Sequence, residues 1–482
     1  MKLAMHKIQG IDVAILFFIV LEGLLCVENL FFPQEVVNHF LYISNYLLII
    51  LIIVKLIISG VSIHFIPLCF FMCFLVFLMG QKPFEEYYNV YLTFTRVELS
   101  VSEYAIFTAL LYMGIAVTYI TYIFSINNLK KMEVKGNKFR FFCGDKEDIQ
   151  FIIKAFFWIT LPCAVYMQFK IVLVRSALAY TSGYLVNVSI PGMVKVGYYI
   201  FSIVLLLYFA LKPKTSEVIM LIVITMLLQG GIQLFQGRRA LFAGTFLFLI
   251  WYLLRYYGID KLGVKNIVKL GIMALVMIIL FYIVEQNRGG SSSELSINLF
   301  KKFFVSTGGS DSVIANTIRR YNEFPKIGVI YLLNPLMDNP IFNYIFDRSN
   351  ESQTVAYLMD HDSFSHWISY LTSSELYLSG HGMGSCYLAE SYLAFGLGGV
   401  LVVSIILGVI LSKINYINFS DSVFKNAFIF FMVKGIFTLP RDGLFTWASD
   451  FLYLIFTYLL ICFMYQVYRK YNVVLRKDNF NR

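Results

Sequence analysis

Charged residues are scarce in this sequence. Only 14% of its 482 residues are Asp, Glu, Lys or Arg, whereas 59% are hydrophobic and 17% are aromatic. A soluble protein of this length needs a far more charged surface, so the composition indicates an integral membrane protein. The apolar runs are long and continuous, unlike the short alternating strands of a membrane β-barrel. We therefore expect an all-α, polytopic membrane protein.

The motifs of several enzyme classes are also missing. The sequence contains no GxGxxG, Walker loop, HExxH or GxSxG, so nothing in it suggests a nucleotide, a bound metal or a serine nucleophile. Its seven cysteines are scattered. Cys69 and Cys73, four positions apart on one expected helix, are better explained as small apolar side chains than as a bridge. No disulfide framework and no set of metal ligands follows, and we expect neither a metal nor a cofactor.

What the sequence does contain is a series of apolar segments long enough to cross a membrane, which takes roughly 20 residues. Twelve spanning helices are expected, at 11–32, 40–59, 62–80, 103–126, 151–174, 196–211, 216–236, 239–257, 267–285, 387–412, 423–439 and 447–468. One long polar stretch, from Glu285 to Cys386, separates the ninth from the tenth. Connections of that length are usually functional or disordered. The predicted organisation is membrane helices over 1–285, a large loop with short helices over 286–386, and membrane helices with a tail over 387–482.

The net charge of +10 does not indicate a nucleic-acid partner, because the basic residues lie mainly in short loops between apolar runs. That is the pattern of the positive-inside rule. With twelve helices, seven basic clusters fall on one side, which predicts cytoplasmic N- and C-termini. These clusters contain Lys2, Lys7, Lys55, Lys130, Lys131, Lys135, Lys138, Arg140, Lys146, Lys212, Lys214, Arg255, Lys261, Lys265, Lys269, Lys413, Arg469, Lys470, Arg476 and Lys477.

A second group of cations breaks this trend, because it is expected at the opposite, outer side. Arg238 and Arg239 follow a helix with a stripe of glutamines at 229, 233 and 236, Arg288 follows the ninth helix, and Arg441 ends the helix that carries Lys434. Guanidinium groups bind phosphate oxygens with paired donors, so several on one face suit a diphosphate. Alternatively, the glutamines bond between helices and the arginines anchor at the membrane interface.

The segment GHGMGSC, which closes the long loop, contains the other candidates. His381 stands among glycines just before a helix, and Glu390 is expected about two turns into that helix. A histidine here could act as a general base or donate to a substrate, and a helix start is a natural anion site. In the structural alternative, the glycines serve close packing and Glu390 pairs with an arginine.

Three further features carry expectations. Between Ser312 and Phe324 the apolar positions share a helical face, which predicts an amphipathic helix containing Arg319 and Arg320. Glu22, in the first spanning helix, is better explained by pairing inside the bundle than by a proton path. The loop from Gln81 to Ser102 interleaves carboxylates with tyrosines, which suits either a sugar-binding surface or an ordinary interfacial belt.

Taken together, these segments resemble the O-antigen polymerases of the Wzy family. The resemblance covers mainly residues 230 to 445. It rests on the helix count, a large outer loop late in the chain, a GRR turn, an arginine-glycine step after the next helix, and GHGMGSCYLAESYLAFGLGG closing the loop. The glycine-rich closing segment is its most specific part.

The resemblance implies a glycosyltransferase of the GT-C type in the bacterial inner membrane, serving lipopolysaccharide biosynthesis. Such an enzyme joins undecaprenyl-diphosphate-linked sugar repeats on the periplasmic face, without a nucleotide sugar or a metal. By position, Arg238, Arg239, Arg288 and Arg441 would hold the donor diphosphate and stabilise negative charge as it leaves, with Arg288 counted as catalytic and Lys434 as a further substrate-binding residue. His381 and Glu390 would orient or deprotonate the acceptor hydroxyl, and Arg319 and Arg320 would clamp the donor.

Two alternatives remain at this point. A flippase or transporter of a lipid-linked glycan would need the same arginines, but also a cavity open alternately to both faces and, usually, internal two-fold repetition, which the sequence lacks. An O-antigen ligase would share the donor site and differ only in its acceptor. The expected partners are the lipid-linked oligosaccharide donor and acceptor, membrane lipid and a protein that sets chain length, with no nucleic acid.

Overall fold

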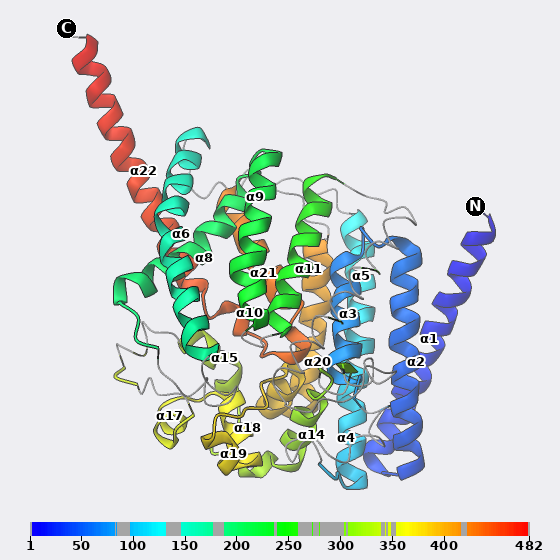
Figure 1. Ribbon diagram of the computed structural model, residues 1–482. Coiled ribbons are helices and arrows are strands. Elements are labelled where there is room, and N and C mark those ends of the chain that lie inside the picture. Colours follow the sequence, from blue (N-terminus) through cyan, green and yellow to red (C-terminus); the bar gives the residue numbers. More distant parts are fainter. Residues whose placement is uncertain are drawn as a thin grey trace. The chain divides into compact units, whose positions relative to one another are not determined.

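The computed structural model describes residues 2–81, 83, 97–131, 146–176, 188–235, 239–258, 272, 279, 303–304, 307–338, 343, 346–348, 353–415 and 422–480 (Figure 1). Within these ranges the chain is helical and contains no β-strand. This confirms the expected all-α class.

Eight helical stretches within the described residues are long and apolar enough to cross a membrane. They are Gly10–Phe31, Glu35–Gly60, Val101–Asn127, Asp148–Val174, Gly192–Ala210, Thr215–Leu234, Tyr387–Asn415 and Thr446–Lys470. The apolar helices Phe65–Leu78 and Ala240–Tyr256 are shorter. The chain is thus a multi-pass membrane protein, while the total of twelve remains a prediction. Most of the expected ninth helix, 267–285, lies outside the described residues.

The chain forms two compact units. The first comprises Met1–Val134, Leu247–Ile417 and Gly435–Thr446, and the second comprises Lys135–Phe246, Asn418–Lys434 and Trp447–Arg482. The helices α11 (Arg239–Tyr256) and α21 (Val423–Ile436) run across the boundaries between them. These two compact units do not follow the predicted linear division into membrane helices, a large loop and further membrane helices. That linear division remains a prediction.

The first unit contains most of the residues of interest here. Its elements are α1 (Lys2–Phe31), α2 (Glu35–Gly60), α3 (Phe65–Leu78), α4 (Val101–Tyr112), η2 (Met113–Val117), α5 (Thr118–Lys131), α14 (Asp311–Arg319), η4 (Tyr321–Glu323), α15 (Ile330–Met337), α17 (Val355–Asp360), α18 (Phe364–Thr372), α19 (Ser374–Leu378), α20 (Tyr387–Asn415) and η5 (Leu439–Arg441).

Helix α20 packs along α5 and η2 in the core of this unit. The helices approach closely at Gly408, where a Cβ atom would lie 2.5 Å from Oγ1 of Thr121 and 2.6 Å from the carbonyl oxygen of Thr118. Small residues at a helix interface allow backbones to meet in this way. Nearby, the Ser412 hydroxyl donates to Ser125 Oγ at 2.6 Å. Glycine at 408 therefore sets the distance between the two helices.

A kink divides α20 into two helical parts. Phe395 and Gly396 have non-helical backbone angles, and Gly396 has a φ of 60°, a conformation that glycine adopts without strain. The part before the kink begins at Tyr387 and is largely buried. Glu390 lies in its first turn, not about two turns into the helix as expected from the sequence. The expected start of the spanning helix, at residue 387, agrees with the structure; only the distance of Glu390 from that start was wrong.

The described residues of the long loop form short helices at the end of the first unit where α4 begins (Figure 1). Helix α14 packs against α4, α18 and α20, and α15 packs against α20. Residues 311–318 of the helix expected to be amphipathic are all buried, whereas Arg319 at its end is exposed. Contacts with three helices cover both its apolar face and its polar one.

The second unit contains α6 (Lys146–Ser176), α8 (Gly192–Ala210), α9 (Thr215–Thr225), η3 (Met226–Gly231), α10 (Ile232–Phe235) and α22 (Phe451–Phe480). Helices α6 and α8 form its main contact, and α22 packs against both. A Cβ at Gly197 would lie 2.6 Å from Sγ of Cys163, so a glycine lets these two helices approach. Lys154 on α6 pairs with Glu217 on α9 at 2.5 Å.

Two expectations about side chains inside the bundle are confirmed, one for Glu22 and one for Cys69 and Cys73. The Ser44 hydroxyl on α2 donates to the buried Glu22 carboxylate on α1, which is pairing within the bundle. Cys69 and Cys73 are free thiols, as are the other described cysteines. The helices of the first unit are thus joined by a few buried hydrogen bonds without a disulfide among the described residues.

Candidate active site

Among the predicted site residues whose side chains the structure describes, Glu390 is the most enclosed. Its side chain lies in the first turn of α20 and is only 2% exposed. The Ser385 hydroxyl donates to Oε1 at 2.6 Å, and the backbone N–H of Leu444 donates to Oε2 at 2.9 Å. A Cβ at Gly443 would lie 2.3 Å from Oε1, so only glycine fits there. Glu390 therefore connects the end of the long loop to the turn after η5.

Arg441 stands on that same turn. It is the last residue of η5, which packs against α3 and α20. Its guanidinium carbon lies 5.8 Å from the centre of the Phe77 ring on α3, within the range of a cation–π contact. The carboxylate of Glu390 thus fixes a backbone position three residues beyond Arg441, and Phe77 supports the guanidinium group itself.

Asp442 follows Arg441 and is a titratable group of the turn. Its Oδ1 accepts from the Gly443 N–H at 2.9 Å. Burial raises the pKa of Asp442 to about 6, although hydrogen bonds from Thr446 and Gly443 and the charge of Arg441 act in the opposite direction. The turn therefore becomes more positive below about pH 6, when this carboxylate takes up a proton.

His381 lies on the irregular segment between α19 and α20 and is half-buried. Its Nδ1 is 3.1 Å from the Ser379 hydroxyl, and its carbonyl oxygen accepts from Gln353 Nε2 at 3.2 Å. Its backbone N–H donates to the carbonyl of Leu376. The backbone here is fixed at two points, while the imidazole keeps part of its surface open.

The loop arginines are engaged within the chain. Arg319 Nη1 donates to the carbonyl oxygen of Glu98 at 3.2 Å, and Arg320 forms an ion pair with Glu323 at 2.6 Å. Both stand at the C-terminal end of α14, where cations complement the helix dipole. A clamp on a donor would require these contacts to exchange for contacts with the ligand.

Lys434 lies in the second unit. Its Nζ donates to Oε1 of Gln229 at 2.9 Å. Gln229 belongs to the π-helical segment η3, and such segments are frequent at functional sites. The bond between Lys434 and Gln229 joins two helices, as expected if the glutamine stripe serves helix packing.

A model of the O-antigen polysaccharide polymerase Wzy family matches residues 11–472, nearly the whole sequence. The chain belongs to this family. Wzy membership gives it the general function of an O-antigen polymerase, a polymerising activity of the glycosyltransferase kind on lipid-linked oligosaccharide repeat units. Neither the curated proteins nor the solved structures contain a match to it.

Three of the arginines assigned to the diphosphate lie wholly or partly outside the described residues. Arg238 and Arg288 are outside them, and Arg239 is described only as the first residue of α11, without its side chain. Their grouping with Arg441 stays a prediction. Among the described residues, no three His, Cys, Asp or Glu side chains converge as metal ligands would.

Some residues of this Wzy chain escaped sequence reasoning. Ser385 and Gly443 complete the surroundings of Glu390, yet an isolated serine and glycine give no signal. In the long loop, Asp338 Oδ1 lies 3.1 Å from Nδ1 of His361, and Asp338 Oδ2 accepts from the Tyr357 hydroxyl at 2.9 Å. The Tyr357 ring also contacts the ring of His366. The HDSFSH segment holding both histidines was the available signal.

Proposed function

We propose that this chain elongates a surface polysaccharide by moving the growing glycan from undecaprenyl diphosphate onto the next lipid-linked repeat unit. The match of the Wzy family over residues 11–472 is the observation that carries the proposal. In the reaction, the bond between the anomeric carbon and the diphosphate oxygen breaks, and a bond forms between that carbon and an acceptor hydroxyl. The hydroxyl proton passes to a base, and undecaprenyl diphosphate leaves.

In this proposal Arg441 contacts the leaving diphosphate together with Arg238, Arg239 and Arg288. Paired guanidinium donors stabilise phosphate charge as it develops. The support for Arg441 is that two contacts position its turn, Glu390 with Leu444 and Phe77 with the guanidinium group. Lys434, Arg319 and Arg320 are proposed as further donor contacts.

Between the two candidate bases, we assign acid–base chemistry to His381 and a positioning role to Glu390. The Glu390 carboxylate is 2% exposed and both of its oxygens accept hydrogen bonds, so an acceptor hydroxyl would have to displace one of them. His381 is only half-buried, and an imidazole can both accept and donate a proton.

The proposed site of the reaction is the periplasmic face of the inner membrane, with both termini in the cytoplasm. The support is the distribution of lysine and arginine among the loops. A cysteine at the exposed Ser379, in a variant without native cysteines, should react with an impermeant maleimide from outside spheroplasts, whereas one at Tyr257 should not. The reverse labelling pattern would invert the proposed topology.

The lipopolysaccharide pattern of a strain lacking this chain tests the function. A polymerase is required only for repeats beyond the first, so the ladder should collapse to a band carrying one repeat unit. Loss of every O-antigen band would instead indicate a flippase or a ligase. Restoring the gene should restore the ladder.

A further inference from the structure

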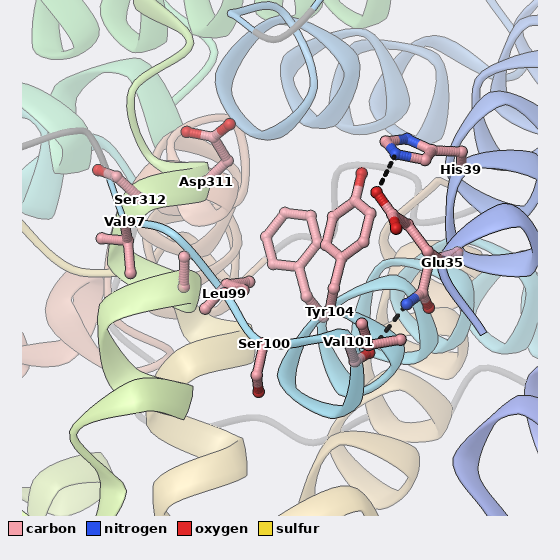
Figure 2. Close-up of a pocket in the computed structure, with 12 residues that line it drawn as sticks. Glu35, His39, Val97, Leu99, Ser100, Val101, Tyr104, Asp311 and Ser312 are labelled. Atoms are coloured by element: carbon pink, nitrogen blue, oxygen red, sulfur yellow. Dashed lines mark hydrogen bonds and ion pairs between the residues drawn. The ribbon is translucent and has the colours of Figure 1, made fainter. Parts of the chain in front are cut away.

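A cleft of about 390 Å³ opens in the first unit, and its lining includes no residue of the Glu390 turn described above. Figure 2 shows its walls: the start of α2 with Glu35 and His39, the start of α4 with Tyr104, and the start of α14 with Asp311 and Ser312. Small-molecule sites have volumes of about 300–1,000 Å³, so there is room for one or two sugar rings. All three walls belong to segments that the basic-residue distribution puts at the outer side.

The charge of the lining is acidic. Glu35 and Asp311 contribute carboxylates, and no lysine or arginine is among the lining residues that the structure describes. His39 is 4.0 Å from Glu35, and the side chains are 61% and 77% exposed, so Glu35 has a largely open carboxylate. Like charges disfavour a phosphate or an acidic sugar here. Carboxylate oxygens instead accept hydrogen bonds from hydroxyl groups.

An aromatic wall stands between the two carboxylates. Figure 2 shows Tyr104 in the middle of the cleft, with Glu35 and His39 on one side and Asp311 on the other. The Tyr104 ring stacks on the Phe107 ring, with the ring centroids 5.8 Å apart and an interplanar angle of 16°. It also stacks on the Tyr42 ring, with the centroids 6.5 Å apart. Aromatic rings present an electron-rich face to C–H groups, which is the surface that a sugar ring offers from one side.

The walls are held in place before any ligand arrives. Ser100 and Glu103 form a capping box at the start of α4, and the buried Asn38 donates to the carbonyl oxygen of Val101 at 2.8 Å. At the far end of α14, Arg319 bonds to the carbonyl of Glu98. These contacts connect α2, α4 and the loop helix, so binding would require little reorganisation.

We propose that this cleft binds a sugar ring without acidic substituents, seated on Tyr104, with its hydroxyls donating to Glu35 and Asp311. The proposal rests on the proposed function, since it assigns the ring to the glycan that the chain elongates. The acidic lining of the cleft distinguishes it from a diphosphate site, which needs cations. The cleft would hold sugars of the glycan apart from the position where the new bond forms.

Titration of the purified full-length chain with O-polysaccharide freed of lipid by mild acid tests the proposal. We expect binding that Glu35→Gln and Tyr104→Leu each weaken about tenfold, the effect of losing a hydrogen bond to a charged group or an aromatic contact. Because the Glu35 side chain is largely exposed, the Glu35→Gln substitution should not disturb folding. Glu375→Gln and Tyr257→Leu make the same changes at other exposed positions and should bind as the wild type does.

Two further arms of the titration identify the ligand. A single lipid-free repeat unit and the polymer, compared at equal sugar concentration, show whether one repeat suffices or the cleft prefers a longer chain. Inorganic pyrophosphate should not compete. Equal affinity in all variants, or displacement by pyrophosphate, overturns the cleft assignment. Because this titration involves no turnover, a wild-type chain that binds glycan but makes no polymer would refute the proposed function alone.

Discussion

At the scale of single residues, Glu390 is a buried carboxylate whose two hydrogen bonds connect the end of the long loop to the turn after η5. Its partners Ser385 and Leu444 are five residues before it and 54 residues after it. The sequence marked Glu390 as unusual because an ionisable group inside an expected spanning helix needs a reason. Its partners could not be predicted, since one is a backbone N–H far along the chain.

We predict that Glu390→Gln lowers both thermal stability and polymer yield. An amide has a single acceptor oxygen, so the bonds donated by Ser385 and Leu444 cannot both be kept as they are, and a buried donor left unsatisfied costs about 1–3 kcal/mol. Ser385→Ala, which removes a donor and leaves the carboxylate bonded to Leu444, should have the smaller effect on chain length. Thermal unfolding in detergent and lipopolysaccharide gels measure the two properties. A Glu390→Gln variant with a normal ladder would refute the positioning role.

For Arg441, we predict that alanine and lysine variants both remain in the membrane but produce only single repeat units. Lysine preserves the charge but lacks the paired planar donors. Arg288→Ala should behave in the same way. Arg469→Lys, an exposed position near the C-terminus, provides the matched control and should give a normal ladder. Long chains in the Arg441 variants would reject its role at the diphosphate.

At the scale of secondary-structure elements, apolar runs predicted where helices occur, and glycines determine how they are arranged. The segment FGLGG was predicted only as part of a helix. In the structure it contains the kink at Gly396, and Gly399 approaches the Ser391 carbonyl so closely that a Cβ would lie 2.2 Å away. Hydropathy carries no information on backbone angles, so the kink could not be foreseen.

Gly408→Ala should lower the unfolding temperature, because a Cβ there would meet Thr121 and the Thr118 carbonyl at 2.5–2.6 Å. Overpacking of this kind typically costs about 1–3 kcal/mol. Gly398→Ala on the same helix is the control, since nothing lies within 4 Å of its Cβ position. There, alanine should be neutral or stabilising because of its higher helix propensity. Equal unfolding temperatures for both variants would contradict the packing of α20 on α5.

The long loop holds a buried histidine whose titration gives a pH prediction. Burial lowers the pKa of His366 from 6.5 to about 4, with nearby Asp338 opposing the shift and His361 adding to it. Its Nδ1 is 2.9 Å from the Tyr377 hydroxyl. Between pH 6.5 and pH 4, His366 is therefore protonated in the unfolded loop but neutral in the folded loop. The contribution of neutral His366 to the stability of the loop is complete above pH 6.5 and declines toward pH 4.

The loop should accordingly become more susceptible to limited proteolysis between pH 7 and pH 5. At about 1.4 kcal/mol per pKa unit, the full effect is at most about 3 kcal/mol. His366→Gln removes the titrating group and should flatten the pH dependence, whatever its effect at pH 7. An unchanged pH dependence in that variant would show that another group is responsible.

At the scale of the whole molecule, composition alone predicted a multi-pass helical membrane protein, and the structure confirms this class. The resemblance carried by residues 230–445 led to the same family that matches across residues 11–472. The cleft could not be read from the sequence, because its walls come from the starts of α2, α4 and α14, at Glu35, Val101 and Asp311. Scattered carboxylates and tyrosines become a site only when the fold brings them together.

The central claim is that this chain alone joins lipid-linked repeat units. The direct measurement is reconstitution of the purified chain into liposomes containing one undecaprenyl-diphosphate-linked repeat unit, followed by gel analysis of the glycan released by mild acid. The account predicts a ladder of two and more repeats that is absent with Arg441→Ala. Lipid-linked single repeats that remain unjoined, or merely cross the bilayer, would contradict it.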